Sequence, residues 1–203
     1  MPTDTGPGHL VELNTTQPIW ECFYWVAPLV LIGTREADGG HDLAPKHMVT
    51  PLGWQNYFGF VCEPRHRTYQ NARREGAFTV SYPRPSQLVE TSLAASPRDS
   101  DGNKPALDAL PVFAALGVDA PLLRGGYLFL ECALERVIDG FGNNSLVVGR
   151  ITAARIDPSV QRHADGDPQA LLKNAPLLVY LHPERFASID QSFSFPFPAG
   201  MRK

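Results

Sequence analysis

Short apolar runs in which every second position is hydrophobic recur along the 203-residue chain and predict β-strands. In Tyr127–Ile138, positions 128, 130, 132, 134 and 138 are apolar, with only Arg136 out of pattern. Ser145–Ile156 is the expected antiparallel partner, across a turn at Phe141–Asn144. The other predicted strands are Pro28–Arg35, Leu43–Thr50, Tyr57–Cys62, Ala77–Tyr82 and Leu177–Leu181. A turn at Asp38-Gly39-Gly40 would pair the first two of these as a hairpin.

Short helical patterns lie between the strands. Thr68–Glu75 is a predicted helix with Thr68 as its expected N-cap and Gly76 as its stop. The other predicted helices are Gln87–Ala95, Ala106–Leu116 with a break or restart at Pro111, and Gln169–Asn174. Helices do not alternate regularly with strands, so a doubly wound parallel sheet is not expected. Six to seven strands joined mostly by hairpins instead predict a mainly β protein with short helices, a closed or split antiparallel β-barrel.

The composition is that of a soluble globular protein, with 43% hydrophobic and 19% charged residues. We expect a flexible N-terminal arm over residues 1–18, one domain over residues 19–190, and an aromatic C-terminal tail over residues 191–203 that contains FSFPFP. The net charge of -3 and the absence of a basic face argue against nucleic-acid binding.

The three cysteines are odd in number, far apart and not arranged as CxxC. This pattern favours reduced thiols and argues against a zinc site. The N-terminal residues lack the basic and apolar regions of a signal peptide, and no apolar run approaches the roughly 20 residues that span a bilayer. We therefore expect a cytoplasmic protein without membrane attachment.

Cations crowd the start of the helix that is predicted after the Tyr57–Cys62 strand. The segment reads CEPRHRTYQN over residues 62–71, and extra cations at a helix N-terminus cost roughly 0.3–1 kcal/mol each. A bound anion removes this cost because it accepts hydrogen bonds from the free backbone amides. Arg65, Arg67 and Thr68 provide matching donors, with Asn71 on the same turn, so the segment predicts a phosphate site. A solvated basic loop with a capping threonine is the alternative.

A second candidate segment, DLAPKHMVTP over residues 42–51, begins as a strand but contains two prolines. Pro45 and Pro51 interrupt ladder pairing and leave backbone N–H groups free to bond a flat heteroaromatic ligand. Lys46 and Thr50 would add polar contacts and Met48 an apolar one. A bulged edge strand with no ligand is the alternative interpretation.

His47 and His66 raise the question of a metal site or a general base. Neither lies in a ligand spacing such as HxxxH and neither is paired with a carboxylate, so a polar surface or phosphate-contact role is favoured. The chain contains no GxSxG elbow, P-loop or GxGxxG. If a nicotinamide nucleotide binds, a Rossmann unit does not hold it.

The two segments, in this order, resemble those of the flavin reductase-like family, which includes flavoredoxin-like proteins and has an FMN-binding split β-barrel fold. The resemblance runs from about Pro28 to Ile189. It rests on PLVLIGTR, the Asp-Gly turn and DLAP, and then on FVCEPRHRTYQNARREGAFTVSYP. NKPAL at 103–107, Leu130–Ile138, NSLVVGRITAARID and PLLVYLHPERFASI follow in the order that the family leads one to expect.

The resemblance implies a bound flavin, FMN or possibly FAD, and a set of residues that would hold it. Main-chain groups of the first segment would contact the isoalloxazine ring, and the loop that opens with Cys62 and Glu63 would take the phosphate. The implied residues are Ala44, Pro45, Lys46, His47, Met48, Val49 and Thr50, then Arg65, His66, Arg67 and Thr68, with Asn71 as a further candidate. Two features depart from the family: Lys46 and His47 replace small hydroxyl residues, and residues 63–67 are unusually charged.

The expected function is that of an FMN-dependent NAD(P)H:flavin reductase-like oxidoreductase. Flavin N5 would carry the chemistry, so no catalytic side chain is expected. Electrons would pass from NADH or NADPH to flavin and on to an acceptor or a partner monooxygenase. The alternatives are a non-enzymatic FMN-binding electron carrier, and a related split barrel that binds haem or nothing.

The resemblance also implies a homodimer with the flavin near the subunit interface. The aromatic tail, Phe193–Phe197, would pack on the neighbouring subunit or dock on its own barrel.

Overall fold

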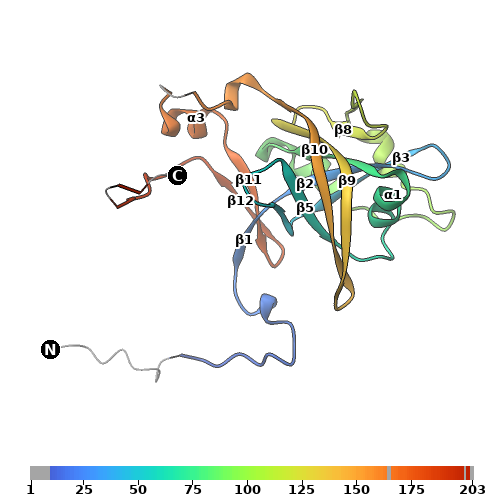
Figure 1. The fold of residues 1–203 in the computed structure, drawn as a ribbon, viewed down its shortest axis with the longest axis horizontal. Coiled ribbons are helices and arrows are strands. Elements are labelled where there is room, and N and C mark those ends of the chain that lie inside the picture. Colours follow the sequence, from blue (N-terminus) through green and yellow to red (C-terminus); the bar gives the residue numbers. More distant parts are fainter. Residues whose placement is uncertain (1–9, 164–165, 199, 202–203) are drawn as a thin grey trace.

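The computed structural model describes residues 10–163, 166–198 and 200–201. Its centre is a seven-stranded antiparallel sheet in the order β3-β2-β6-β9-β10-β5-β4. The strands are β2 (Val30–Arg35), β3 (His41–Lys46), β4 (Val49–Pro51), β5 (Tyr57–Cys62), β6 (Ala77–Tyr82), β9 (Leu128–Phe141) and β10 (Asn144–Ile156). The sheet curls into the barrel-like body of Figure 1, with the long β9–β10 ribbon running across it.

The two edge strands of this sheet are consecutive in the sequence. β3 and β4 are separated by His47 and Met48 alone, yet they occupy opposite edges of the seven strands. Two residues can bridge the edges only because the sheet curls until they approach, as in the predicted split β-barrel. The single strand predicted over Leu43–Thr50 is therefore wrong: it is two strands. Both Pro45 and Pro51 lie in edge strands, where a missing N–H breaks no ladder on the open side.

Two smaller sheets complete the described part of the chain. β1 (Trp25–Pro28), β11 (Leu177–His182) and β12 (Arg185–Ile189) form one in the order β1-β11-β12, and β7 (Val112–Ala114) pairs with β8 (Pro121–Leu123). The described residues thus hold twelve strands, so the prediction of six to seven, with Leu177–Leu181 as the last, was wrong. Separate strands were missed because they are as short as three residues or, like β12, largely exposed.

The helices are short and lie between strands. They are α1 (Arg67–Glu75), α2 (Leu88–Leu93) and α3 (Pro168–Asn174), with 3-10 turns at Ile19–Glu21, Pro85–Gln87, Pro105–Ala109 and Pro158–Val160. α1 ends at Gly76 in the left-handed conformation, with φ of 66°, as predicted. The helix predicted over Ala106–Leu116 was wrong, because the 3-10 turn ends before Pro111 and β7 follows.

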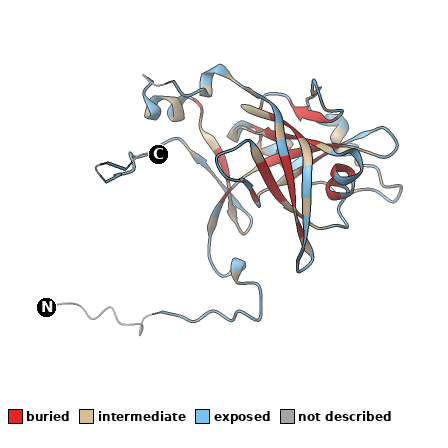
Figure 2. Cartoon of the chain, viewed as in Figure 1, coloured by how far each residue is buried: buried red, intermediate tan, exposed pale blue. Residues whose placement is uncertain are grey.

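The core has two parts that lie on opposite faces of β2. Inside the barrel, Phe58, Phe60 and Phe78 pack together, with the last two ring centroids 5.1 Å apart. Successive strand side chains alternate between faces, so Ile32 joins this interior cluster while Leu31 joins a second one beneath the loops around α2. Figure 2 shows the buried residues along the central strands and on one side of α1.

The described parts of both terminal segments lie outside the barrel (Figure 1). Residues 10–18 of the predicted arm are exposed and form no strand or helix, and residues 1–9 lie outside the described residues. Phe193 and Phe195 of the tail are 86% and 71% exposed. No helix in the described ranges combines the length and the apolar character that crossing a bilayer requires.

Candidate functional site

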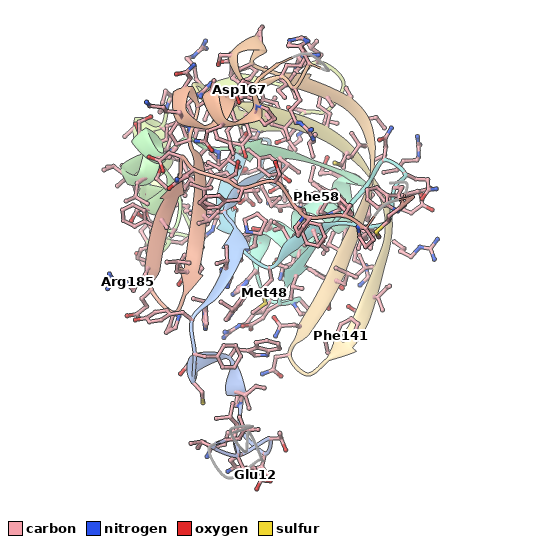
Figure 3. The ribbon with its side chains drawn as sticks, turned by 90° about the vertical axis from the view of Figure 1, so that its left-hand side faces the viewer. Glu12, Met48, Phe58, Phe141, Asp167 and Arg185 are labelled. Carbon is pink, nitrogen blue, oxygen red and sulfur yellow. The ribbon has the colours of Figure 1, made fainter. Side chains whose placement is uncertain are left out.

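The first candidate segment is the crossing from β3 to β4. Ala44 and Val49 are buried on either side of it, whereas Met48 and Thr50 are exposed. The Thr50 hydroxyl donates a hydrogen bond to the carbonyl oxygen of Pro51 at 3.1 Å. The crossing therefore presents backbone and side chains at the seam of the barrel. Met48 can be located on this seam in Figure 3.

The second candidate segment is the loop from β5 into α1. Cys62 is buried at the end of β5, and the N-cap of α1 is His66, which makes no side-chain capping bond. The predicted N-cap at Thr68 was wrong, because Thr68 is the second helical residue and is buried. The first turn of α1 thus lacks a side-chain cap and carries Arg67 at its first position.

The structure brings these two segments together. The backbone amide of Val61 donates to the carbonyl oxygen of Met48 at 2.9 Å, one residue before Cys62. The Sγ of Cys62 lies 3.9 Å from Nδ1 of His66. Burial raises the pKa of the Cys62 thiol, and the nearby Lys46 ammonium opposes that rise. Burial, followed by Lys46, lowers the pKa of His66. Lys46 therefore reaches from one segment to the other.

The two candidate arginines point to different surroundings. Arg65 is 78% exposed, pairs with Glu63, and lines a cavity of about 530 Å³ together with the β9–β10 turn. Arg67 lines a cavity of about 680 Å³ between the β2–β3 hairpin and residues 98–108. Its Nη2 lies 3.8 Å from where a Cβ would stand on Gly102. One small anion cannot be expected to meet both guanidinium groups.

Asn71 faces the interior of the protein. Its Nδ2 donates to Oγ1 of Thr34 at 3.1 Å, and its Oδ1 accepts from Nη1 of Arg74 at 3.0 Å. Both ends of the amide are thus engaged: the Nδ2 bond attaches α1 to β2, and the Oδ1 bond lies within α1. Thr68, also buried, lies on the same side of the helix, where α1 packs against the sheet.

The larger cavity has a charge network that the sequence did not reveal. Asp42 is buried and accepts from Nζ of Lys104 at 3.3 Å, while Nη2 of Arg98 lies 3.2 Å from the same oxygen. Arg98 also pairs with Glu36. Burial lowers the pKa of Lys104, and Asp42 opposes that shift. Among the described residues the Arg67 guanidinium makes no hydrogen bond or ion pair, so it differs from the paired Arg98 and Lys104.

A cluster of aromatic rings and imidazoles surrounds the β3–β4 crossing. The ring of His47 lies 4.6 Å from that of Tyr180, 5.7 Å from His182 and 5.8 Å from Trp25, measured between centroids. Burial, followed by His182 and Lys46, lowers the pKa of His47. Sequence analysis missed Trp25, Tyr180 and His182, because they meet His47 only through the pairing of β1 with β11.

Three ring nitrogens of this cluster are buried without a hydrogen-bond partner: Nε1 of Trp25, Nε2 of His47 and Nδ1 of His182. Buried polar atoms are normally paired, so three in one place indicate a missing partner. The indole N–H only donates, so an acceptor oxygen or nitrogen would suit it. Among the described residues, no group of three or more His, Cys, Asp or Glu is placed to hold a metal ion.

Comparison with known proteins gives the same fold and a family. The sequence matches the domain described as "Flavin reductase like domain" over residues 25–189. Flavoredoxin from Methanosarcina acetivorans aligns with a TM-score of 0.75 at 19% identity, covering 94% of this chain and 97% of that one.

Two components of larger enzyme systems are also similar in structure. Nitrilotriacetate monooxygenase component B from Bacillus cereus has a TM-score of 0.77 at 16% identity, covering 92% of this chain and 98% of that one. BorF, the flavin reductase component of a bacterial two-component tryptophan halogenase, has a TM-score of 0.63 at 21% identity, covering 83% and 93%. At these identities the structural matches establish the split-barrel fold.

Proposed function

The chain belongs to the flavin reductase-like family, and on that premise we propose that it is an FMN-dependent oxidoreductase that accepts a hydride from NADH or NADPH. The observation that carries the proposal is the Val61–Met48 hydrogen bond, which joins the two segments that resemble the flavin-contact and phosphate segments of the family. The bond continues the pairing of β4 with β5, and that pairing places the two segments side by side at the seam of the barrel.

The residues present fit a flavin. The crossing from Ala44 to Thr50 offers exposed edge-strand backbone, and the unpaired His47 nitrogen offers a polar contact next to it. Arg67 offers an uncommitted guanidinium at the uncapped start of α1. When bound, a flavin supplies the hydride acceptor and the electron relay.

The protein residues would bind and orient the flavin rather than act as acids, bases or nucleophiles. We assign the phosphate to Arg67 and the first amides of α1, because Arg98 and Lys104 in the same cavity are already neutralised by acids. Lys46 adds positive field from the side of Cys62, and His66, whose pKa is lowered, offers a neutral imidazole there. Arg65, which is exposed, pairs with Glu63 and lines the other cavity, is not assigned to the phosphate.

The similarity to a monooxygenase component and to a halogenase's flavin reductase supports an electron acceptor in the form of a partner oxygenase. The similarity to flavoredoxin supports the competing function, a flavin-binding electron carrier with little NAD(P)H activity of its own. The two functions differ in whether nicotinamide nucleotides reduce the bound flavin directly.

Two measurements on the purified protein decide between these functions. The visible spectrum, before and after addition of FMN or FAD, reports whether flavin binds and which one is preferred. Stopped-flow mixing with NADH and NADPH then follows bleaching of the flavin band, with free FMN at the same concentration as the control. Reduction much faster than that of free FMN supports the reductase. Bound flavin that NAD(P)H does not bleach favours the carrier, and a protein that takes up no flavin rejects both.

A further inference from the structure

An apolar groove lies on the outer surface between α2 and the β11–β12 hairpin, and it shares no lining residue with the Arg67 cavity. Its volume of about 530 Å³ is that of a pocket for one small molecule. Val89 is 67% exposed and Phe186 51% exposed, although both are large apolar residues. We call this surface the α2 groove. Its apolar lining consists mainly of Leu29, Pro45, Leu88, Val89, Leu93 and Phe186.

The hairpin side of the groove is aromatic. Tyr180 on β11 and Phe186 on β12 are directly opposite each other in an antiparallel pair, so their side chains lie on the same face of the hairpin. Both residues line the groove, and Leu88 and Val89 line it from α2. A flat apolar group between these walls would contact aromatic rings on one side and aliphatic carbons on the other. The α2 groove therefore suits an aromatic ring.

Two charges of opposite sign line the same groove. Glu184 and Arg185 are consecutive, and neither side chain makes a hydrogen bond or ion pair within the part of the chain that the structure describes. Figure 3 shows Arg185 on the β11–β12 hairpin. A zwitterion beside them can pair its carboxylate with the Arg185 guanidinium and its ammonium with the Glu184 carboxylate. A ligand with a single charge would meet one attractive and one repulsive neighbour.

The backbone of Glu184 adopts an uncommon conformation at this point. Its φ of 59° lies in the left-handed region, which favours glycine over glutamate. The amide of Glu184 donates to the Oη of Tyr180 at 2.9 Å, and this bond fixes the turn against the aromatic wall. Strained backbone of this kind is found mainly at functional and ligand-binding sites. A glycine would relieve the strain, but the carboxylate at the end of the groove would be lost.

We propose that the α2 groove binds a free aromatic amino acid. The ring of the ligand lies between α2 and the Tyr180–Phe186 wall, and its ammonium and carboxylate meet Glu184 and Arg185. The Tyr180 ring also lies 4.6 Å from the ring of His47, measured between centroids. The bound ligand is therefore one side chain away from the β3–β4 crossing, without taking the place of a flavin there.

Calorimetric titration of the full chain with L-phenylalanine tests the proposal, and three related compounds separate its parts. Phenethylamine lacks the carboxylate, hydrocinnamate lacks the ammonium, and L-alanine lacks the ring. Each should bind at least about 10-fold more weakly than L-phenylalanine, because a charge-assisted contact or the ring contact is lost. Phenethylamine or hydrocinnamate binding as tightly as L-phenylalanine would overturn the proposal, and so would a protein that does not bind L-phenylalanine.

Two charge variants locate the head group of the ligand. Arg185→Met keeps an unbranched stem and should weaken L-phenylalanine binding roughly 10- to 150-fold, but phenethylamine should bind no more weakly. Glu184→Gln should likewise weaken L-phenylalanine binding, but not that of hydrocinnamate. Arg150→Met, at an exposed position on β10 outside the groove, is the matched control and should leave the affinity unchanged. Unchanged L-phenylalanine affinity in Arg185→Met would contradict the proposed site.

Val89→Trp, which fills the groove from α2, distinguishes the small ligand from another occupant. This variant should lose L-phenylalanine binding, while its mass measured by light scattering stays that of the unaltered protein. Persistent binding would place the ligand elsewhere, and a halved mass would show that a second copy covers the groove. Either result overturns the proposal.

The ring contact between Tyr180 and His47 provides an independent readout. In NMR spectra L-phenylalanine should shift the imidazole signals of His47, which are assigned by their absence in His47→Phe. The signals of the exposed His163 should not move. Binding that leaves the His47 signals unshifted would contradict the position of the ligand. No readout depends on flavin turnover, so a failure here leaves the proposed function untouched.

Discussion

The amide of Val61 donates a hydrogen bond of 2.9 Å to the carbonyl oxygen of Met48. This bond continues the β4–β5 pairing by one residue and fixes the β3–β4 crossing beside Cys62. The β3–β4 crossing and the loop from β5 into α1 are thereby held side by side, although they are separate segments of the chain. This contact fixes the position of the segment that would bind a planar ring relative to the segment that would bind the charged end of the same ligand.

The separation of the two arginines predicts unequal effects on flavin affinity. Arg67→Ala should weaken FMN binding roughly 10- to 150-fold, the equivalent of about 1.5–3 kcal/mol for a charge-assisted hydrogen bond. Arg65→Ala, with a 78% exposed side chain already paired with Glu63, should change the affinity by less than about fivefold. Fluorescence titration of FMN measures both.

Arg67→Lys refines this prediction, because it keeps the charge and loses the forked donors. We expect an affinity between those of the unaltered protein and Arg67→Ala. A larger loss for Arg65→Ala than for Arg67→Ala would place the phosphate in the cavity beside the β9–β10 turn instead.

The regular strands were predictable from the sequence, whereas the orientation of the site residues was not. Tyr57–Cys62 and Ala77–Tyr82 have the predicted bounds, because their apolar patterns and flanking turns are unambiguous. Arg65 and Arg67 line different cavities because α1 begins between them, and the sequence defines helix boundaries poorly. That His47 meets Trp25 and His182 depends on β1 pairing with a strand some 150 positions further along, which leaves no local signal.

Two imidazoles with lowered pKa values, those of His47 and His66, predict a loss of stability as the pH falls. Burial, then His182 and Lys46, lowers the pKa of His47 below its usual 6.5, and burial and Lys46 lower the pKa of His66. Between the unfolded value and the lowered folded value, the unfolded chain binds more protons, so unfolding becomes easier as the pH falls below 6.5. Above the pKa of the unfolded chain, the contribution of these two imidazoles to stability is fully present.

Thermal unfolding from about pH 7.5 to 5 tests this expectation, in a range where carboxylates change little. His47→Phe keeps a ring in the cluster and removes its titration, so its melting temperature should fall less with acidification. His163→Phe, at an exposed loop position, is the control. A pH dependence of His47→Phe as steep as that of the unaltered protein would mean that His47 does not contribute.

The three thiols should differ in reactivity. Cys22 is exposed, whereas Cys62 and Cys132 are buried. Burial raises the pKa of the Cys62 thiol, and burial together with Glu131 raises the pKa of Cys132 to about 12. Since the thiolate is the reactive form, a mild alkylating agent at neutral pH should modify Cys22 first, then Cys62 and last Cys132. Peptide mass spectrometry gives the order, and early labelling of Cys132 would contradict the described packing.

Glu131 should be important for stability although it lies outside the proposed flavin site. It is buried in β9 and accepts hydrogen bonds from the amides of Leu116 and Gly117, at 3.1 and 2.6 Å, and from Nη2 of Arg155 at 2.6 Å. In Glu131→Gln one oxygen becomes an NH₂ group that faces a donor, and Arg155 loses its counter-charge. We expect the free energy of unfolding to fall by about 1.5–3 kcal/mol.

Urea unfolding measures this loss, and Glu135→Gln is the matched control on the same strand. Within the described part of the chain Glu135 forms one ion pair, with Arg136 at 3.5 Å, and the Arg136 side chain is 66% exposed, so we expect a change of no more than about 1 kcal/mol. Because Glu131 holds the loop at residues 116–117 and not the β3–β4 crossing, Glu131→Gln should retain FMN affinity while it is folded. Equal stability of the two variants would show that the loop amides and Arg155 find other partners when the carboxylate is removed.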